Sequence, residues 1–123
     1  NNHSCVNAAI QYGGIAALDG PEDELKHMLE KFSIRRKLIV EGLNSLNGVQ
    51  CNLPGGAFYA FANVKETGMN AQEFSNKCLN EVGVAIVPGT AFGNFATDYV
   101  RFSFAASKEN ISKAIEKIDK MLK

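Results

Sequence analysis

The stretch Val84-Ala85-Ile86-Val87-Pro88-Gly89-Thr90-Ala91-Phe92-Gly93 is followed, after a short connection, by Tyr99-Val100-Arg101-Phe102-Ser103-Phe104-Ala105. Two apolar runs of strand type therefore enclose a Gly/Pro loop. Neighbouring side chains on a strand point to opposite faces, so Arg101 is expected to share its face with Tyr99 and Ser103. An arginine presented from a rigid strand suits bidentate binding of a carboxylate or phosphate. An arginine on a solvated strand face is the alternative interpretation.

The rest of the chain predicts helices around these two strands. Apolar residues recur at helical spacing over Asn2–Leu18, over a long segment from Pro21 to Asn47, after Asn70 as far as Val82, and after Ser107 to the end. Short strands are expected at Val49–Asn52 and Ala57–Ala62. This order of elements predicts an α+β fold, a small and mostly antiparallel sheet with helices packed on it.

The long second helix carries the clearest apolar stripe. Its members are Leu25, Met28, Leu29, Phe32, Ile39, Leu43 and Leu46, and the stripe is expected to face the sheet. The adjacent pair Arg35-Arg36 stands among acidic residues, so we interpret it as a solvated face without a function. The run Ala57–Ala62 is too apolar on both faces for an edge strand. In the first helix, Gly13-Gly14 indicates either a close approach to a neighbour or a weak point.

Composition excludes several classes of function. The chain has 123 residues, which fits one domain, and its 13 basic residues balance 13 acidic ones, so neither nucleic acid nor an anionic membrane is an expected partner. No apolar run is long enough to span a membrane, and the amino terminus lacks the pattern of a signal peptide. Together with the cysteine pattern, this predicts a cytoplasmic protein.

Cysteines, histidines and glycine loops supply little chemistry by themselves. Cys5, Cys51 and Cys78 are widely spaced and read as reduced thiols, and His3 and His27 complete no metal pattern. The loops Gly55-Gly56 and Gly89 to Gly93 have the composition to cradle a phosphate through backbone N–H groups, but they are more often simple turns. No nucleophile motif was found, so no catalytic residue and no metal ligand is assigned.

Several segments together resemble a known family. They are Gln11 through Leu18 with Gly20-Pro21, Arg35-Arg36 with Glu41-Gly42-Leu43, Pro54-Gly55-Gly56-Ala57-Phe58-Tyr59, Val87 through Gly93, and Tyr99 through Ala105. In this order they resemble the C-terminal small domain of fold-type I, pyridoxal-phosphate-dependent aminotransferases, nearest to the aspartate aminotransferase branch. The resemblance covers essentially the whole chain.

The resemblance implies roles for particular residues. It places Arg101 at the α-carboxylate of the amino-acid substrate and Gly56, Pro88 and Gly89 near the active-site cleft. It implies an interdomain helix over residues 1–20 and a small domain over residues 21–123. None of the lysines in this chain corresponds to the Schiff-base lysine, so no catalytic and no cofactor-binding residue is expected here.

The resemblance also implies partners outside this chain. Pyridoxal phosphate is expected in the full-length enzyme but not bound to this fragment, which would be inactive alone. The expected partners are amino-acid and 2-oxo-acid substrates, the protein's own N-terminal large domain, and a second copy in a homodimer. A free-standing ligand-binding or interaction module on the same scaffold is the alternative, because fold does not determine function.

Overall fold

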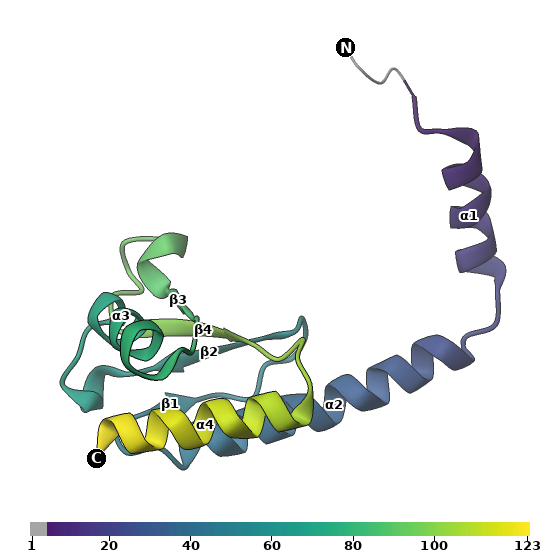
Figure 1. The fold of residues 1–123 in the computed structure, drawn as a ribbon. Helices are drawn as coiled ribbons and strands as arrows, with labels where there is room; N and C mark the ends of the chain where they lie inside the picture. Colours follow the sequence, from purple (N-terminus) through teal and green to yellow (C-terminus); the bar gives the residue numbers. More distant parts are fainter. Residues whose placement is uncertain (1–4) are drawn as a thin grey trace.

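A computed structural model describes residues 5–123 of the chain (Figure 1). The elements, in order, are α1 (Ala8–Asp19), α2 (Asp23–Asn44), β1 (Gln50–Cys51), β2 (Tyr59–Asn63), η1 (Lys65–Thr67), α3 (Ala71–Val82), β3 (Val87–Pro88), η2 (Gly89–Phe92), β4 (Tyr99–Ser103) and α4 (Lys108–Leu122). The α+β class expected from the sequence is confirmed. None of the described helices has the length and apolar character of a membrane span.

The four strands form one sheet in the order β1-β2-β4-β3, and every neighbouring pair is antiparallel. The strand β2 is central, as its apolar character on both faces predicted. The strand β3 is at the edge and holds only two residues, so the predicted strand from Val84 is shorter than expected. An edge position tolerates Pro88, which has no N–H to donate to a neighbouring strand.

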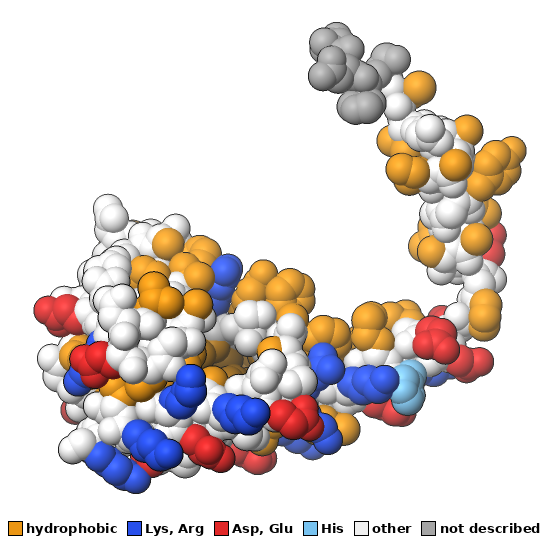
Figure 2. Space-filling view, in the orientation of Figure 1, with side chains coloured by type: hydrophobic (Ala, Val, Ile, Leu, Met, Phe, Trp, Pro, Cys, Tyr) orange, Lys and Arg blue, Asp and Glu red, His pale blue; other side chains and the backbone are white. Residues whose placement is uncertain are grey.

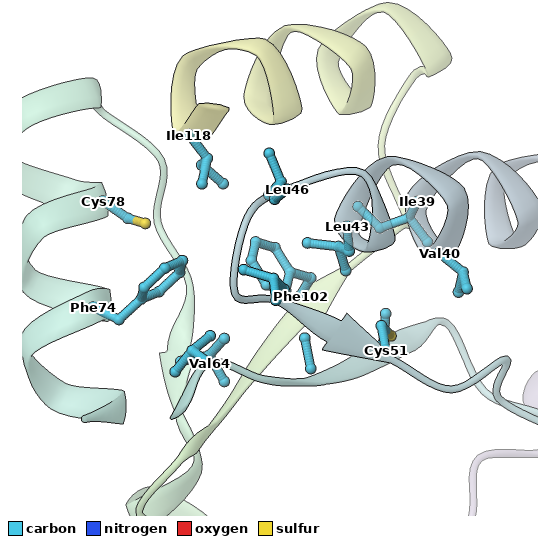
Figure 3. Close-up of a cluster of buried hydrophobic side chains, with 14 of the residues drawn as sticks. Ile39, Val40, Leu43, Leu46, Cys51, Val64, Phe74, Cys78, Phe102 and Ile118 are labelled. Atoms are coloured by element: carbon cyan, nitrogen blue, oxygen red, sulfur yellow. The ribbon is translucent and has the colours of Figure 1, made fainter. Parts of the chain in front are cut away.

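Three helices cover one face of the sheet. Ala60, Ala62, Val100 and Phe102 alternate toward this face and are buried in one core with residues of α2, α3 and α4. Figure 3 shows Phe74 and Cys78 of α3, Ile118 of α4 and Leu43 of α2 pointing toward the same centre. Alternation sends the intervening side chains to the other face, which we call the open face: Tyr59, Phe61, Tyr99, Arg101 and Ser103.

Local sequence signals determine where the packed helices begin and end. Asn70 and Glu73 form a capping box at the start of α3, and Gly83 ends that helix in the left-handed conformation. Ser107 accepts a hydrogen bond from the backbone N–H of Asn110 at the start of α4. The two long helices approach closely, because a Cβ on Gly42 of α2 would lie 2.8 Å from Cγ1 of Ile115 on α4.

The predicted apolar stripe of α2 reaches the core only along its second part. Ile39, Leu43 and Leu46 are buried as expected, but Leu25, Met28 and Leu29 are about half exposed, so the prediction is wrong for the first turns. The reason is length: 22 helical residues span about 33 Å, whereas the two longest strands have five residues each and span about 17 Å. Leu79 of α3 is likewise exposed.

The first helix stands apart from the packed body (Figure 1). It begins at Ala8, with the side chain of Asn7 as its cap, and no residue of it is buried. The predicted start at Asn2 falls outside the described residues. A Cβ on Gly13 or Gly14 would meet no atom within 4 Å, so within the described residues these glycines make no close approach. Helix α1 and the first turns of α2, residues 8–29, are called the arm below.

Candidate functional site

Arg101 lies in the middle of β4 with its side chain half-buried on the open face. Its guanidinium carbon is 4.1 Å from the ring centroid of Tyr59 and 4.5 Å from that of Phe92. Within residues 5–123 the guanidinium makes no hydrogen bond and no ion pair. The strand holds Arg101 in place, and all of its N–H donors are left for a ligand.

Aromatic side chains surround this arginine. Phe61 of β2 stacks on Tyr99 of β4 at 5.2 Å between ring centroids, with the planes 12° apart. The Phe61 ring also meets the Phe92 ring edge-on, with 6.4 Å between the ring centroids. Figure 2 shows apolar side chains gathered on the exposed upper part of the sheet region. A cation among aromatic rings, open to solvent on one side, is suited to binding a small anion.

The Pro88-Gly89 segment runs alongside Arg101. The edge strand β3 pairs Val87 with Arg101 and Pro88 with Val100. Gly89 is buried, and a Cβ at this position would lie 2.6 Å from the carbonyl oxygen of Tyr99. Only a residue without a side chain lets the chain pass this close to β4. The structure therefore brings Pro88 and Gly89 to the strand that carries Arg101.

Gly56 belongs to a neighbouring hollow. Its loop lines a pocket of about 230 Å³ with Leu29, Phe32, Ser33, Arg36, Gly55, Ala57 and Phe104, and Arg101 is not part of that lining. Ala57 has a positive φ of 60°, an unusual conformation for a residue with a side chain, and it directs the chain into β2. The chain continues from Gly56 into β2, whose first residue, Tyr59, contacts Arg101.

Arg36 corrects our interpretation of the Arg35-Arg36 pair as a solvated face. The Arg36 side chain is half-buried, and its Nη1 donates a hydrogen bond of 3.2 Å to the carbonyl oxygen of Pro54. Its Nε is buried without a partner in the described part of the chain. The sequence could have predicted this partial burial. Arg36 is four residues after Phe32 and three before Ile39, so it lies on the apolar stripe itself.

Most lysines among residues 5–123 lie on the helices. The lysines are exposed, apart from Lys77, which is half-buried on α3. One pocket does contain lysines, Lys31 and Lys108 beside Glu109, but it lies between α2 and the start of α4, in the helix layer behind the sheet. No lysine of β2, β3 or β4 accompanies Arg101 on the open face.

In the described part of the chain, neither the buried cysteines nor the possible metal ligands suggest a second site. Burial raises the pKa of the Cys51 thiol, and it raises that of Cys78 to about 12, with a further increase from Glu81. A thiol with a raised pKa is a poor nucleophile. Residues 5–123 contain no group of three or more His, Cys, Asp or Glu side chains placed to hold a metal ion.

Comparison with known proteins places this chain in a family. Residues 1–118 match the family of class I and II aminotransferases. The chain belongs to this family. It is 39% identical over 119 residues to an aspartate aminotransferase of Pyrococcus horikoshii, covering 95% of this chain and 30% of that protein. It is 41% identical over 118 residues to an LL-diaminopimelate aminotransferase of Halothermothrix orenii, covering 96% and 30%.

Solved aminotransferase structures share the fold. Alanine aminotransferase from Pyrococcus furiosus superimposes with a TM-score of 0.91 at 33% identity, over 96% of this chain and 30% of that one. Aspartate aminotransferase from Rhizobium meliloti gives a TM-score of 0.82 at 34% identity, over 89% and 29%. The chain therefore spans less than a third of the length of these aminotransferases, and the resemblance inferred from its motifs is confirmed.

Proposed function

We propose that this chain is the C-terminal, substrate-binding part of a pyridoxal-phosphate-dependent aminotransferase. The full-length protein would transfer an amino group between an amino acid, such as aspartate, and a 2-oxo acid. The observation that carries the proposal is Arg101, a cation on a rigid strand whose N–H donors are not used by other residues. Membership of the aminotransferase family supplies the reaction in which such a cation is needed.

The part played by this chain in the reaction is orientation. Arg101 would bind the α-carboxylate of the substrate through two parallel hydrogen bonds, and so hold the reacting carbon in place. Pro88, Gly89 and Gly56 would shape the neighbouring wall of the cleft. When bound elsewhere in the full-length protein, pyridoxal phosphate supplies the electron sink for the carbanion. We assign no catalytic or cofactor-binding role to a residue of this chain.

The arm supports the proposed partners. Ile10, Leu18, Leu25 and Leu29 are about half exposed or more, and a run of apolar side chains of this extent is typical of a surface that another segment covers. We propose that the protein's own N-terminal large domain covers it, with residues 1–20 as the interdomain helix and residues 21–123 as the small domain. The assembly would be a homodimer. The three unpaired cysteines favour a cytoplasmic location.

The test is Arg101→Lys in the full-length protein. Lysine keeps the positive charge but lacks the planar fork of arginine. A decrease in activity therefore measures the contribution of bidentate geometry rather than of charge. We expect kcat/KM for the preferred amino acid to fall about 10- to 150-fold, the equivalent of ~1.5 to 3 kcal/mol for a charge-assisted hydrogen bond. Arg35→Lys is the matched control, because Arg35 also lies against an aromatic ring, that of Phe32, but on α2.

The control variant should retain kcat/KM within about twofold of the parent, as is usual for a substitution outside the site. The chain alone, mixed with the cofactor and passed through gel filtration, should show no transamination and no absorbance of a specific lysine adduct. If Arg101→Lys retains the activity of the parent, the carboxylate role is wrong.

A further inference from the structure

Tyr59 and Phe92 reach Arg101 from the two sides of its strand. Tyr59 is on β2 and Phe92 ends η2, directly after β3, and β2 and β3 are the two neighbours of β4. Both rings lie within 4.5 Å of the guanidinium carbon. The two contacts therefore do not come from one flexible segment, and they enclose the end of a side chain that otherwise has many rotamers.

Contacts of this kind restrain an arginine without using its hydrogen-bond donors. A cation–π contact is made by the positive charge and the ring face, whereas a carboxylate binds to the N–H groups. Restraint by an ion pair would instead occupy those N–H groups and neutralise the charge. Rings also exclude water from the guanidinium, which strengthens any hydrogen bond that it later makes to an anion.

The two rings are themselves supported. Phe92 meets Phe61 edge-on at 6.4 Å, and Tyr59 packs on Phe58 with 4.3 Å between ring centroids. The chain that carries Phe92 is held against β4 where Gly89 passes the carbonyl oxygen of Tyr99. Phe92 is nevertheless 53% exposed, so the core does not explain its presence.

We infer that Tyr59 and Phe92 are positioning residues, which hold the guanidinium of Arg101 ready for a carboxylate ligand. This inference rests on the proposed function, because it needs Arg101 to be the carboxylate-binding group. It assigns a task to the Pro88–Phe92 segment beyond shaping the cleft: Gly89 permits the close approach that sets Phe92 beside the arginine. Binding of the ligand then requires less ordering of the side chain.

The experiment measures binding rather than turnover. In the full-length holoenzyme, the dissociation constant of succinate, a carboxylate with no amino or oxo group to react, is determined by calorimetry for the parent and for Phe92→Leu. Leucine keeps apolar volume but removes the ring face. We expect the dissociation constant to rise about 3- to 30-fold, as for loss of a cation–π contact that is partly shielded from water.

Two variants serve as controls. Phe95→Leu removes an aromatic ring that is 100% exposed, three residues further along the same loop, and should leave succinate binding within about twofold of the parent. Tyr59→Phe keeps the ring and should also bind as the parent does, whereas Tyr59→Leu should weaken binding. Unfolding temperatures of all the variants, measured in parallel, show whether any loss comes from the fold.

The double variant with Arg101→Leu separates the possible failures. If the rings act through Arg101, then Phe92→Leu causes no further loss once the arginine is absent. An additional loss in that background would overturn the inference, because the ring would then act directly. Parent-like binding by Phe92→Leu, while Arg101→Leu binds poorly, would overturn the inference and leave the proposed function standing. Parent-like binding by Arg101→Leu would overturn both.

Discussion

The two parts of helix α2 have the same apolar periodicity and opposite surroundings. In the first turns, Leu25 and Leu29 are about half exposed, whereas Ile39 and Leu43 further along the same stripe are buried against the sheet and α4. Figure 1 shows the helix extending beyond the sheet toward α1. Periodicity therefore identifies the face of a helix that will be covered, but not the segment or the chain that covers it.

The same contrast separates the arm from the packed body. Every α-helix of the body contributes buried residues, and α1 contributes none. A helix of 12 residues that buries no side chain has little stability of its own in water. The arm and the body should therefore differ in stability as they differ in burial.

The largest expected difference is in thiol reactivity, between the cysteine ahead of the arm and the two cysteines of the body. Cys5 is exposed ahead of the arm, while Cys51 and Cys78 are buried in the body. At neutral pH we expect a thiol reagent to modify Cys5 rapidly and Cys78 at least about 10³-fold more slowly, because Cys78 becomes accessible only when the body opens. Mass spectrometry of a time course gives the three rates. Equal rates in denaturant are the control, and equal rates without denaturant would contradict the burial.

The raised pKa of Cys78 adds an alkaline dependence. The protonated thiol is favoured in the folded state, so its contribution to stability is fully present below pH 9. It is lost as the pH rises toward 12, where the folded thiol ionises. The free energy of unfolding should therefore decrease across this alkaline range, and Cys78→Ala should decrease less steeply than the parent.

Shortening apolar side chains of the α2 stripe should change the free energy of unfolding by different amounts in the two parts of the helix. Leu43→Ala removes a fully buried side chain and should lower the free energy of unfolding by about 2 to 5 kcal/mol. Leu29→Ala, the same change on the same helix, should alter it by less than about 0.5 kcal/mol in this chain. Urea denaturation followed by circular dichroism measures both. A similar loss in both variants would mean that the arm packs on the body after all.

Helix-interior glycines give the smallest difference. Gly42→Ala places a methyl group 2.8 Å from Ile115 and should destabilise the body by about 1 to 3 kcal/mol through overpacking. Gly13→Ala meets open space on α1 and should stabilise that helix by about 0.5 to 1 kcal/mol. The Gly13→Ala variant should show increased helicity and an unchanged unfolding midpoint of the body. Loss of helicity in Gly13→Ala would show that α1 is packed.

Much of the fold could be predicted because its signals are local. The capping box at Asn70 and the helix stop at Gly83 act within one helical turn. The alternation around Arg101 assigns it to the face opposite Phe102 before any neighbour is known. Strand lengths were predicted less well, since a strand such as β3 ends where its partner stops pairing rather than where apolar residues stop.

The candidate site was predictable only in part, for the same reason. The ordered motifs were sufficient to indicate the aminotransferase family, and through it they named Arg101, Gly56, Pro88 and Gly89 as candidate site residues. The sequence alone did not show that Arg36 binds the carbonyl oxygen of Pro54, because the end of α2 and strand β1 lie between these two residues. Nothing in the spacing of Gly56 placed it in a pocket separate from Arg101.

The sequence by itself therefore determined the helices, the strands, the face on which Arg101 lies and the family to which the chain belongs. These depend on the backbone geometry of short segments and on the order of motifs along one chain. Only the tertiary structure decided which part of α2 is covered and which rings enclose Arg101. Tyr59, Phe92 and Arg101 meet through the pairing of β2, β3 and β4, and contacts between distant segments depend on that register rather than on any local pattern.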